Sequence, residues 1–188
     1  MARDDVGCGR APPQPDAARS FHEARLSLER FRQAQDASHA GFETALSELR
    51  SGRKTSHWIW YVFPQLAGLG RSSTAVYYGL DGSDEAAAYL RDPVLGTRLV
   101  TAAEVVRGHL TGGRGMPLER LMGSEIDALK LVSCLTLFGH VAKALHASEP
   151  EPRFAAMADH ADAILAAAAA QGYDHCAFTE DHLRRVHP

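Results

Sequence analysis

The sequence lacks two features that would identify common classes of partner. Lysine and arginine number 20 against 23 aspartates and glutamates, a formal net charge of −3, so the basic excess that drives nucleic-acid binding is missing. No stretch approaches the roughly 20 apolar residues that span a bilayer, and residues 1–14 contain no hydrophobic secretory signal. We therefore expect a cytoplasmic protein with no nucleic-acid and no membrane partner.

Residues that bind metals are also sparsely arranged. The three cysteines, Cys8, Cys134 and Cys176, lack the close spacing of zinc ligands, and we expect reduced thiols. The ten histidines are scattered, with no pair at helical i, i+4 spacing around a glutamate. His175, Cys176 and His182 lie near one another, but their spacing matches no zinc site, so we assign them to the surface. We predict no metal and no other cofactor.

Composition and periodicity predict one helical domain after a short leader. Residues 1–18 include three prolines without apolar periodicity and are interpreted as a flexible leader, so the folded domain covers residues 19–188. Alternating strand patterns are sparse, and we predict an all-α fold, a compact single-domain helical bundle. The helical signals are a stripe through Phe21, Ala24, Leu28 and Phe31; a helix from Phe42 to Leu49 ending at Gly52; one capped by Asp92 and ending near Gly108; one opened by Ser124 and Asp127 and running through Val141; and one over Phe154–Ala170.

Aromatic residues make up only 7% of the chain, yet several of them fall within residues 56–65. The apolar positions from Trp58 to Phe63 occupy both faces, which fits a buried helix or a short buried strand, and we favour a helix at the centre of the core. The run also contains side chains with polar atoms that are either satisfied internally or turned toward a ligand: His57, Trp60, Tyr61 and Gln65.

Charged residues in a turn and on the long helix are two further candidates for ligand binding. Arg71, in the turn over residues 68–72, is either a solvated or salt-bridged residue or a clamp for a phosphate or carboxylate. Asp127 and Lys130 are three residues apart on the long helix. Capping and ion pairing explain these two residues without a function, and the alternative is that they face a cleft together with Ser133 and Thr136.

Several short motifs occur between about Leu28 and Phe138. They are Arg30-Phe31, Ala34-Gln35, Ser56-His57-Trp58, Trp60, Phe63-Pro64-Gln65, Gly68-Leu69-Gly70-Arg71-Ser72 and Thr136-Leu137-Phe138. Together they resemble a known family, domain of unknown function 1810. Asp92 and Cys134 depart from the histidine and serine usual in the family. The resemblance implies a compact helical fold and specifies no activity.

A shorter pattern resembles the NADAR family, small helical proteins tied to NAD and ADP-ribose metabolism. Residues 29–35 match its Glu-x-aromatic-x-x-Ala-Gln signature, from Glu29 to Gln35, whereas the later tryptophan-glycine and asparagine-containing motifs are missing. This resemblance implies a nucleotide-like small-molecule substrate related to NAD or ADP-ribose.

We therefore expect an enzyme that cleaves or rearranges an N-glycosidic bond. Such a reaction needs a carboxylate beside the oxocarbenium-like sugar and a proton donor for the leaving base. The predicted catalytic residues are Glu29, Asp127 and His57, and the predicted substrate-binding residues are Gln35, Trp60, Tyr61, Gln65, Arg71 and Lys130. Two alternatives stay open: a non-catalytic module that binds a small ligand or peptide, and an auxiliary enzyme of a specialised biosynthetic pathway.

Overall fold

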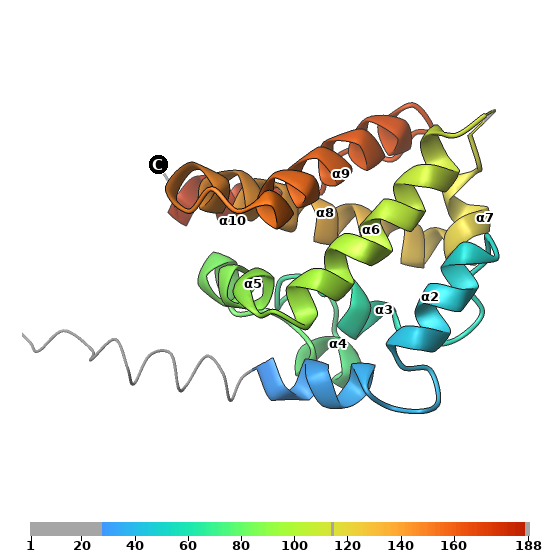
Figure 1. Ribbon diagram of the computed structural model, residues 1–188, viewed down its shortest axis with the longest axis horizontal. Helices are drawn as coiled ribbons and strands as arrows, with labels where there is room; N and C mark the ends of the chain where they lie inside the picture. Colours follow the sequence, from blue (N-terminus) through green and yellow to red (C-terminus); the bar gives the residue numbers. More distant parts are fainter. Residues whose placement is uncertain (1–27, 114, 187–188) are drawn as a thin grey trace, which may run out of the picture.

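The computed structural model describes residues 28–113 and 115–186, and within these ranges it contains helices and no β-strand (Figure 1). The all-α prediction is confirmed. Residues 28–35 are helical, whereas the predicted leader over residues 1–18, Cys8 and the beginning of the first predicted helix lie outside the described residues. The helices that follow are α2 (Phe42–Arg50), α3 (Ile59–Val62), α4 (Ser73–Tyr77), α5 (Gly82–Arg91), α6 (Leu95–Thr111), α7 (Leu118–Met122), α8 (Glu125–Ser148), α9 (Pro152–Ala169) and α10 (Ala177–Val186).

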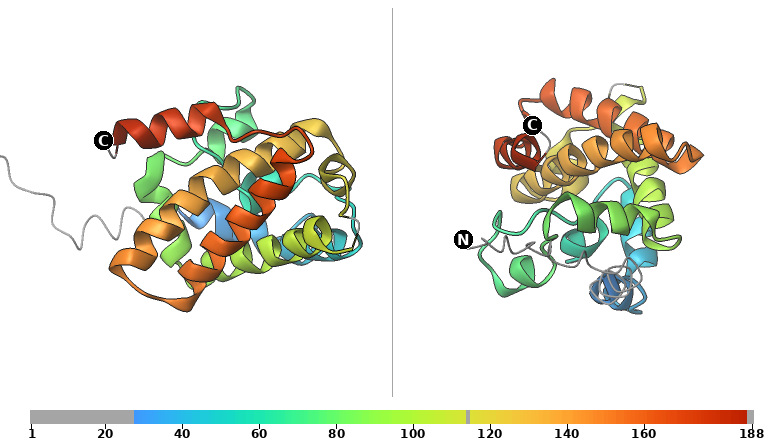
Figure 2. Two further views of the ribbon diagram at one scale, coloured as in Figure 1. Left: turned by 90° about the horizontal axis from the view of Figure 1, so that it is seen from above. Right: turned by 90° about the vertical axis from the view of Figure 1, so that its left-hand side faces the viewer.

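Helix α8 lies at the centre of the fold. Helices α5, α9 and α10 pack against it, and Figure 2 shows α9 lying beside α8, with α10 on another side. Its buried side chains extend from Ala128 to Leu145. By length and composition α8 could cross a membrane, although 72% of its most apolar window is buried inside this fold. The expectation that no stretch approaches membrane-spanning length was therefore wrong. Helix α8 is long and apolar enough, as the buried central helix of a globular fold can be.

The predicted end of α2 and the predicted cap of α6 are confirmed, whereas the predicted end of α6 is wrong. Gly52 ends α2 with φ +75°, the left-handed conformation that glycine adopts without a steric penalty. The carboxylate of Asp92 accepts hydrogen bonds from the backbone N–H groups of Val94 and Leu95, both at 3.0 Å, and so caps α6. The predicted end near Gly108 is wrong: α6 continues through this exposed glycine to Thr111.

The central aromatic run forms the short helix α3, as favoured from the sequence. Trp58, Ile59 and Phe63 are fully buried, and the rings of Trp58 and Phe63 pack 6.3 Å apart. Burying a side chain of this size contributes roughly 1.5–3 kcal/mol through the hydrophobic effect. The core therefore fixes the position of the segment that leads into α3.

Four helices were not predicted from the sequence. Helices α4 and α7 have five residues each, too few for an apolar period to be visible. Helix α5 begins at Gly82, and α10 covers α8 near the C-terminal end of the described residues. Leu66 and Leu80 form an isolated parallel bridge that closes the loop containing α4.

Candidate ligand-binding site

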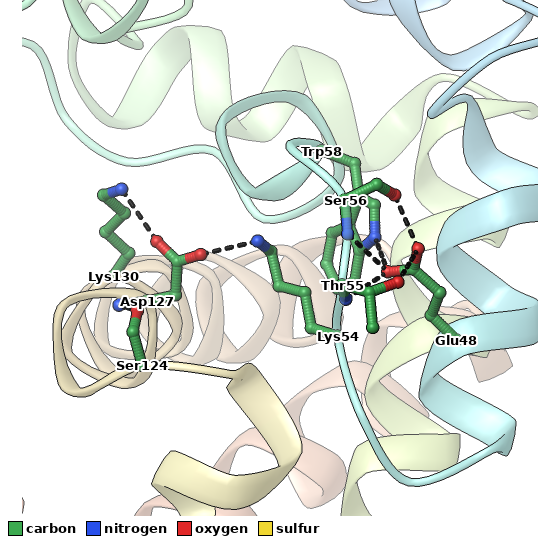
Figure 3. Close-up of polar contacts among 8 residues, drawn as sticks. All are labelled: Glu48, Lys54, Thr55, Ser56, Trp58, Ser124, Asp127 and Lys130. Atoms are coloured by element: carbon green, nitrogen blue, oxygen red, sulfur yellow. Dashed lines mark hydrogen bonds and ion pairs between the residues drawn. The ribbon is translucent and has the colours of Figure 1, made fainter.

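The segment that joins α2 to α3, residues 51–58, is held between two parts of the fold (Figure 3). On one side the backbone N–H of Lys54 donates to the carbonyl of Leu121 at 2.7 Å. At Gly123, which has φ +78°, an added Cβ would lie 2.7 Å from the Lys54 carbonyl oxygen. Any side chain at position 123 would collide with the segment, so Gly123 allows this direct backbone contact.

On the other side, the Glu48 carboxylate of α2 accepts five hydrogen bonds from the segment (Figure 3). The donors are the backbone N–H and hydroxyl groups of Thr55 and Ser56, at 2.6–3.1 Å, and the indole N–H of Trp58, at 2.8 Å. Burial raises the pKa of Glu48, but the bonds from Ser56, Thr55 and Trp58 outweigh it and lower the pKa to about 2. Glu48 is therefore ionised at neutral pH and fixes the shape of the segment.

Asp127, in the first turn of α8, lies between two ammonium groups. Its Oδ2 atom is 2.6 Å from Lys54 Nζ, and its Oδ1 atom is 2.8 Å from Lys130 Nζ. Ser124 caps the helix by accepting from the Asp127 backbone N–H at 3.2 Å. Burial raises the pKa of Asp127, whereas hydrogen bonds and charges from Lys130 and Lys54 lower it, with a net decrease. The predicted cap and the predicted ion pair both form, and Lys54 adds a second ion pair.

Each lysine of this cluster also lies over a tryptophan. Lys130 Nζ is 4.3 Å from the ring centroid of Trp60, which is half-buried, and Lys54 Nζ is 5.2 Å from that of the fully buried Trp58. Ammonium groups at these distances are attracted by the negative face of the ring. We call Lys54, Trp60, Asp127 and Lys130 the lysine–aspartate cluster.

The structure thus brings together three of the predicted site residues, Trp60, Asp127 and Lys130. His57 belongs to the same segment as Lys54, and its side chain is exposed. Ser133 and Thr136 do not continue this polar line into a common cleft. They are buried, and they contact Cys176 and Thr179 near the beginning of α10.

Gln35 and Tyr61 lie in a different environment, inside the core. The Gln35 amide donates to the Tyr61 carbonyl at 2.7 Å and to the Tyr89 hydroxyl at 2.8 Å. The Tyr61 hydroxyl donates to the Ala40 carbonyl at 2.8 Å, and burial, followed by Tyr78, raises the pKa of Tyr61 to about 12. Their polar atoms are thus used in internal bonds, and we leave both residues out of the proposed site.

The remaining predicted residues are separate from the cluster. Glu29 is exposed on the helical segment 28–35 and accepts from Gln33 at 3.3 Å. Gln65 is half-buried, and its carbonyl accepts from the Leu80 backbone N–H at 2.8 Å. Arg71 is exposed beside α4. The ion pairs and ring contacts that orient the lysine–aspartate cluster therefore do not orient these three side chains.

The C-terminal histidines and cysteine need a correction. His175 is exposed and pairs with Glu180 at 3.3 Å, but Cys176 and His182 are half-buried and not surface residues. Cys176 packs against Ser133 of α8, whose hydroxyl is 3.2 Å from its sulfur atom. Within residues 28–113 and 115–186, no three His, Cys, Asp or Glu side chains are grouped closely enough to hold a metal ion.

Sequence reasoning missed Lys54 and Glu48. Lys54 lies two residues after Gly52, which ends α2, and belongs to no periodic pattern. Glu48 lies between the buried residues Leu46 and Leu49, and its donors come from a segment without periodicity. The available signal was the pair of hydroxyl residues, Thr55 and Ser56, seven and eight residues after a helical glutamate.

Comparisons with known proteins place the chain in a family. A family model described as protein of unknown function (DUF1810) matches residues 25–161, which include the whole lysine–aspartate cluster. The chain is similar to the crystal structure of the conserved hypothetical protein Rv1873 from Mycobacterium tuberculosis, with 35% identity and a TM-score of 0.58, over 79% of this chain and 98% of that one. No curated protein matches the chain. The resemblance to the NADAR family stays a prediction. The chain belongs to the DUF1810 family of proteins of unknown function.

Proposed function

We propose that the lysine–aspartate cluster binds a nucleotide-like small molecule related to NAD or ADP-ribose, and that the protein cleaves or rearranges its N-glycosidic bond. One observation carries the proposal: the Lys130 ammonium group is 2.8 Å from Asp127 and 4.3 Å from the centroid of the half-buried Trp60 ring. A nucleotide presents the complementary pair of features, a flat base and an anionic phosphate.

The charge of the cluster supports binding of an anion. Two ammonium groups and one carboxylate leave a net positive charge beside Trp60. The Lys54 and Lys130 side chains are only 7% and 19% exposed, so water screens them less than it screens surface lysines. A phosphate would draw the Lys130 ammonium group away from the face of Trp60 and share it with Asp127, and the base would then stack on the uncovered ring.

The chemistry would assign distinct roles to Asp127 and His57. In a hydrolysis, the bond between the anomeric carbon and the base nitrogen breaks, and its electron pair stays on the base. Nicotinamide leaves as a neutral base, whereas adenine also takes up a proton, which His57, in the segment held by Glu48, would supply. A water oxygen bonds to the anomeric carbon and gives up one proton, which would restore the proton lost by His57. Burial raises the pKa of Asp127 but Lys130 and Lys54 lower it further, so Asp127 stays ionised and would stabilise the oxocarbenium-like sugar.

A binding module without catalysis is the second candidate, and a specific observation favours it. Both carboxylate oxygens of Asp127 already accept from ammonium groups, which reduces its capacity to interact with a sugar cation. Such a module would keep the stacking ring and the lysines and release no product. Ligand binding and product release therefore have to be measured separately.

The test is thermal unfolding with ADP-ribose, NAD and adenosine, together with chromatography for released base. At a hundredfold excess over the dissociation constant, a ligand that binds only the native state stabilises it by about 2.7 kcal/mol. Since each kcal/mol shifts Tm by about 2–4 °C in a domain of this size, we expect ADP-ribose or NAD to raise Tm by about 5–11 °C, and adenosine, which lacks phosphates, to have a smaller effect.

Variants identify the site. Trp60→Ala and Lys130→Ala should remove the increase in Tm, whereas Lys143→Ala, at an exposed lysine further along α8, should retain it. Binding without released base would select the binding module. If neither nucleotide changes Tm and no base is released, the proposed function is wrong.

A further inference from the structure

A cavity lies on the same central helix, and its lining includes no residue of the lysine–aspartate cluster. It has a volume of about 350 Å³ and opens between α8, α9 and α10. One face of α8, from Leu135 to Lys143, forms one wall, Asp162 and Leu165 of α9 form another, and Leu183 and Arg184 of α10 form the third. This volume lies within the range of small-molecule sites, roughly 300–1,000 Å³.

The bottom of the cavity is apolar. Leu135, Leu165 and Leu183 line it and are almost completely buried. Gly139 also lines it, and a Cβ at this position would lie 3.0 Å from the Cβ of Ala161. Helices α8 and α9 therefore approach closely at Gly139, and α10 contributes the opposite apolar wall. An apolar body that entered here would lose contact with water on several sides.

The charged groups at the rim are not equivalent. Lys143 of α8 and Asp162 of α9 form an ion pair, with Nζ 2.7 Å from Oδ1. His175 Nδ1 lies beside the Glu180 carboxylate. The counter-ion of Arg184 is Asp181, which does not line the cavity. The Arg184 guanidinium group therefore lines the cavity, whereas its counter-ion lies outside the lining. Both Arg184 and Asp181 are more than half exposed, and such a pair contributes little stability, so a ligand can replace or share it.

We propose that this cavity binds a small amphipathic carboxylate, with its hydrocarbon part against Leu135, Leu165 and Leu183 and its carboxylate on Arg184. The planar guanidinium group offers paired N–H donors that match the two oxygens of a carboxylate. Lys143, on the facing wall, is already paired with Asp162 of the same lining, so Arg184 is the cation assigned to the carboxylate. The site is independent of the proposed nucleotide site, because the two share no residue.

The experiment is an NMR titration of the full chain with octanoate, with octylamine as the cationic counterpart of the same length. We expect octanoate to shift the backbone signals of Gly139 and Leu183, and octylamine to shift them much less. Arg184→Glu should weaken octanoate binding by about tenfold or more, whereas Arg185→Glu, the exposed neighbour outside the lining, should change it less than about twofold.

A second variant fills the cavity without changing its charge. Leu183→Trp should abolish the octanoate shifts, and circular dichroism reports whether this variant is folded. The proposal is overturned if octanoate causes no shifts, if octylamine binds equally well, or if Arg184→Glu binds octanoate as the wild type does. Octanoate shifts confined to Trp60 and Lys130 would also overturn it, whereas failure of ADP-ribose to bind there concerns only the nucleotide site.

Discussion

Glu48 and Asp127 lie on opposite sides of the same chain segment, and they are satisfied in different ways (Figure 3). Neutral N–H and O–H groups, all from residues 55–58, donate to Glu48. Ammonium groups from two different elements donate to Asp127, Lys54 from the segment and Lys130 from α8. Both carboxylates have lowered pKa values, but different kinds of partner overcome the effect of burial.

This difference separates a positioning role from a binding role. Hydrogen bonds from backbone and short side chains are directional, so Glu48 determines the conformation of residues 55–58. Long, flexible lysines can reorient toward a second anion without moving the backbone. The comparison implies that substitution of Glu48 changes the fold of the segment, whereas substitution around Asp127 changes mainly charge.

The largest expected effect belongs to Glu48→Ala. Removing the carboxylate leaves five donors without their acceptor, including the buried indole N–H of Trp58, and should lower the free energy of unfolding by about 3 kcal/mol. Urea denaturation of the variant and the wild type measures this difference in the free energy of unfolding. Glu43→Ala, at an exposed position on the same helix, is the control and should have little effect. A loss no greater than that of the control would contradict the positioning role.

Asp127→Asn should have a smaller effect, about 2 kcal/mol, because Lys54 is left almost buried beside a neutral group. The matched control is Asp162→Asn, which breaks the exposed pair with Lys143 and should cost at most about 1 kcal/mol. Equal losses of unfolding free energy in the two variants would show that the partial burial of the ion pairs of Asp127 does not affect stability.

Ser124→Ala sharpens the comparison at the helix end itself. The Ser124 hydroxyl accepts from the Asp127 backbone N–H, and loss of such a cap costs about 1 kcal/mol. The ion pairs of Asp127 do not depend on this hydroxyl, so the Ser124→Ala variant should retain ligand binding. If Ser124→Ala removed the thermal shift caused by ADP-ribose, the cap and the cluster would not be separable as described.

The same contacts of Glu48 also predict a change in acid sensitivity. The pKa of Glu48 is about 2 in the folded protein and 4.5 as its ordinary value, so the unfolded chain takes up the proton first as the pH falls. The contribution of Glu48 to stability is therefore fully present above pH 4.5 and is lost between pH 4.5 and 2. Urea denaturation over this range should show a shallower decline for Glu48→Gln than for the wild type. Identical slopes would show that Glu48 does not contribute to the acid response.

Sequence patterns predicted the parts of the fold that repeat or that have local signals. The apolar spacing of α2, the left-handed Gly52 and the caps at Asp92 and Ser124 depend on neighbours close in sequence, and all were predicted. The prediction that α6 ends near Gly108 was wrong because glycine also occurs inside helices. Tertiary packing, including the buried Leu110, stabilises α6 beyond this residue.

The candidate site was predicted only in part, for a physical reason. Asp127 and Lys130 are neighbours on one helix, so their spacing predicts the pair. Lys54 reaches Asp127 only because the segment after α2 packs on Gly123, a contact between residues far apart in sequence. The same limit applies to Glu48, whose donors lie in an irregular segment where no period links the carboxylate to its partners.

The apolar character of α8 also has a consequence during synthesis of the chain. Helices α9 and α10, which cover parts of α8, follow it in sequence, so α8 leaves the ribosome before these partners exist. Only residues 149–151 separate α8 from α9, and closing so short a connection costs little entropy. Helix α5 precedes α8 and can pack against it at once, so pairing with α9 covers the part of this 24-residue helix that the earlier helices leave in water. Until α9 is synthesised, that apolar surface stays exposed on the nascent chain.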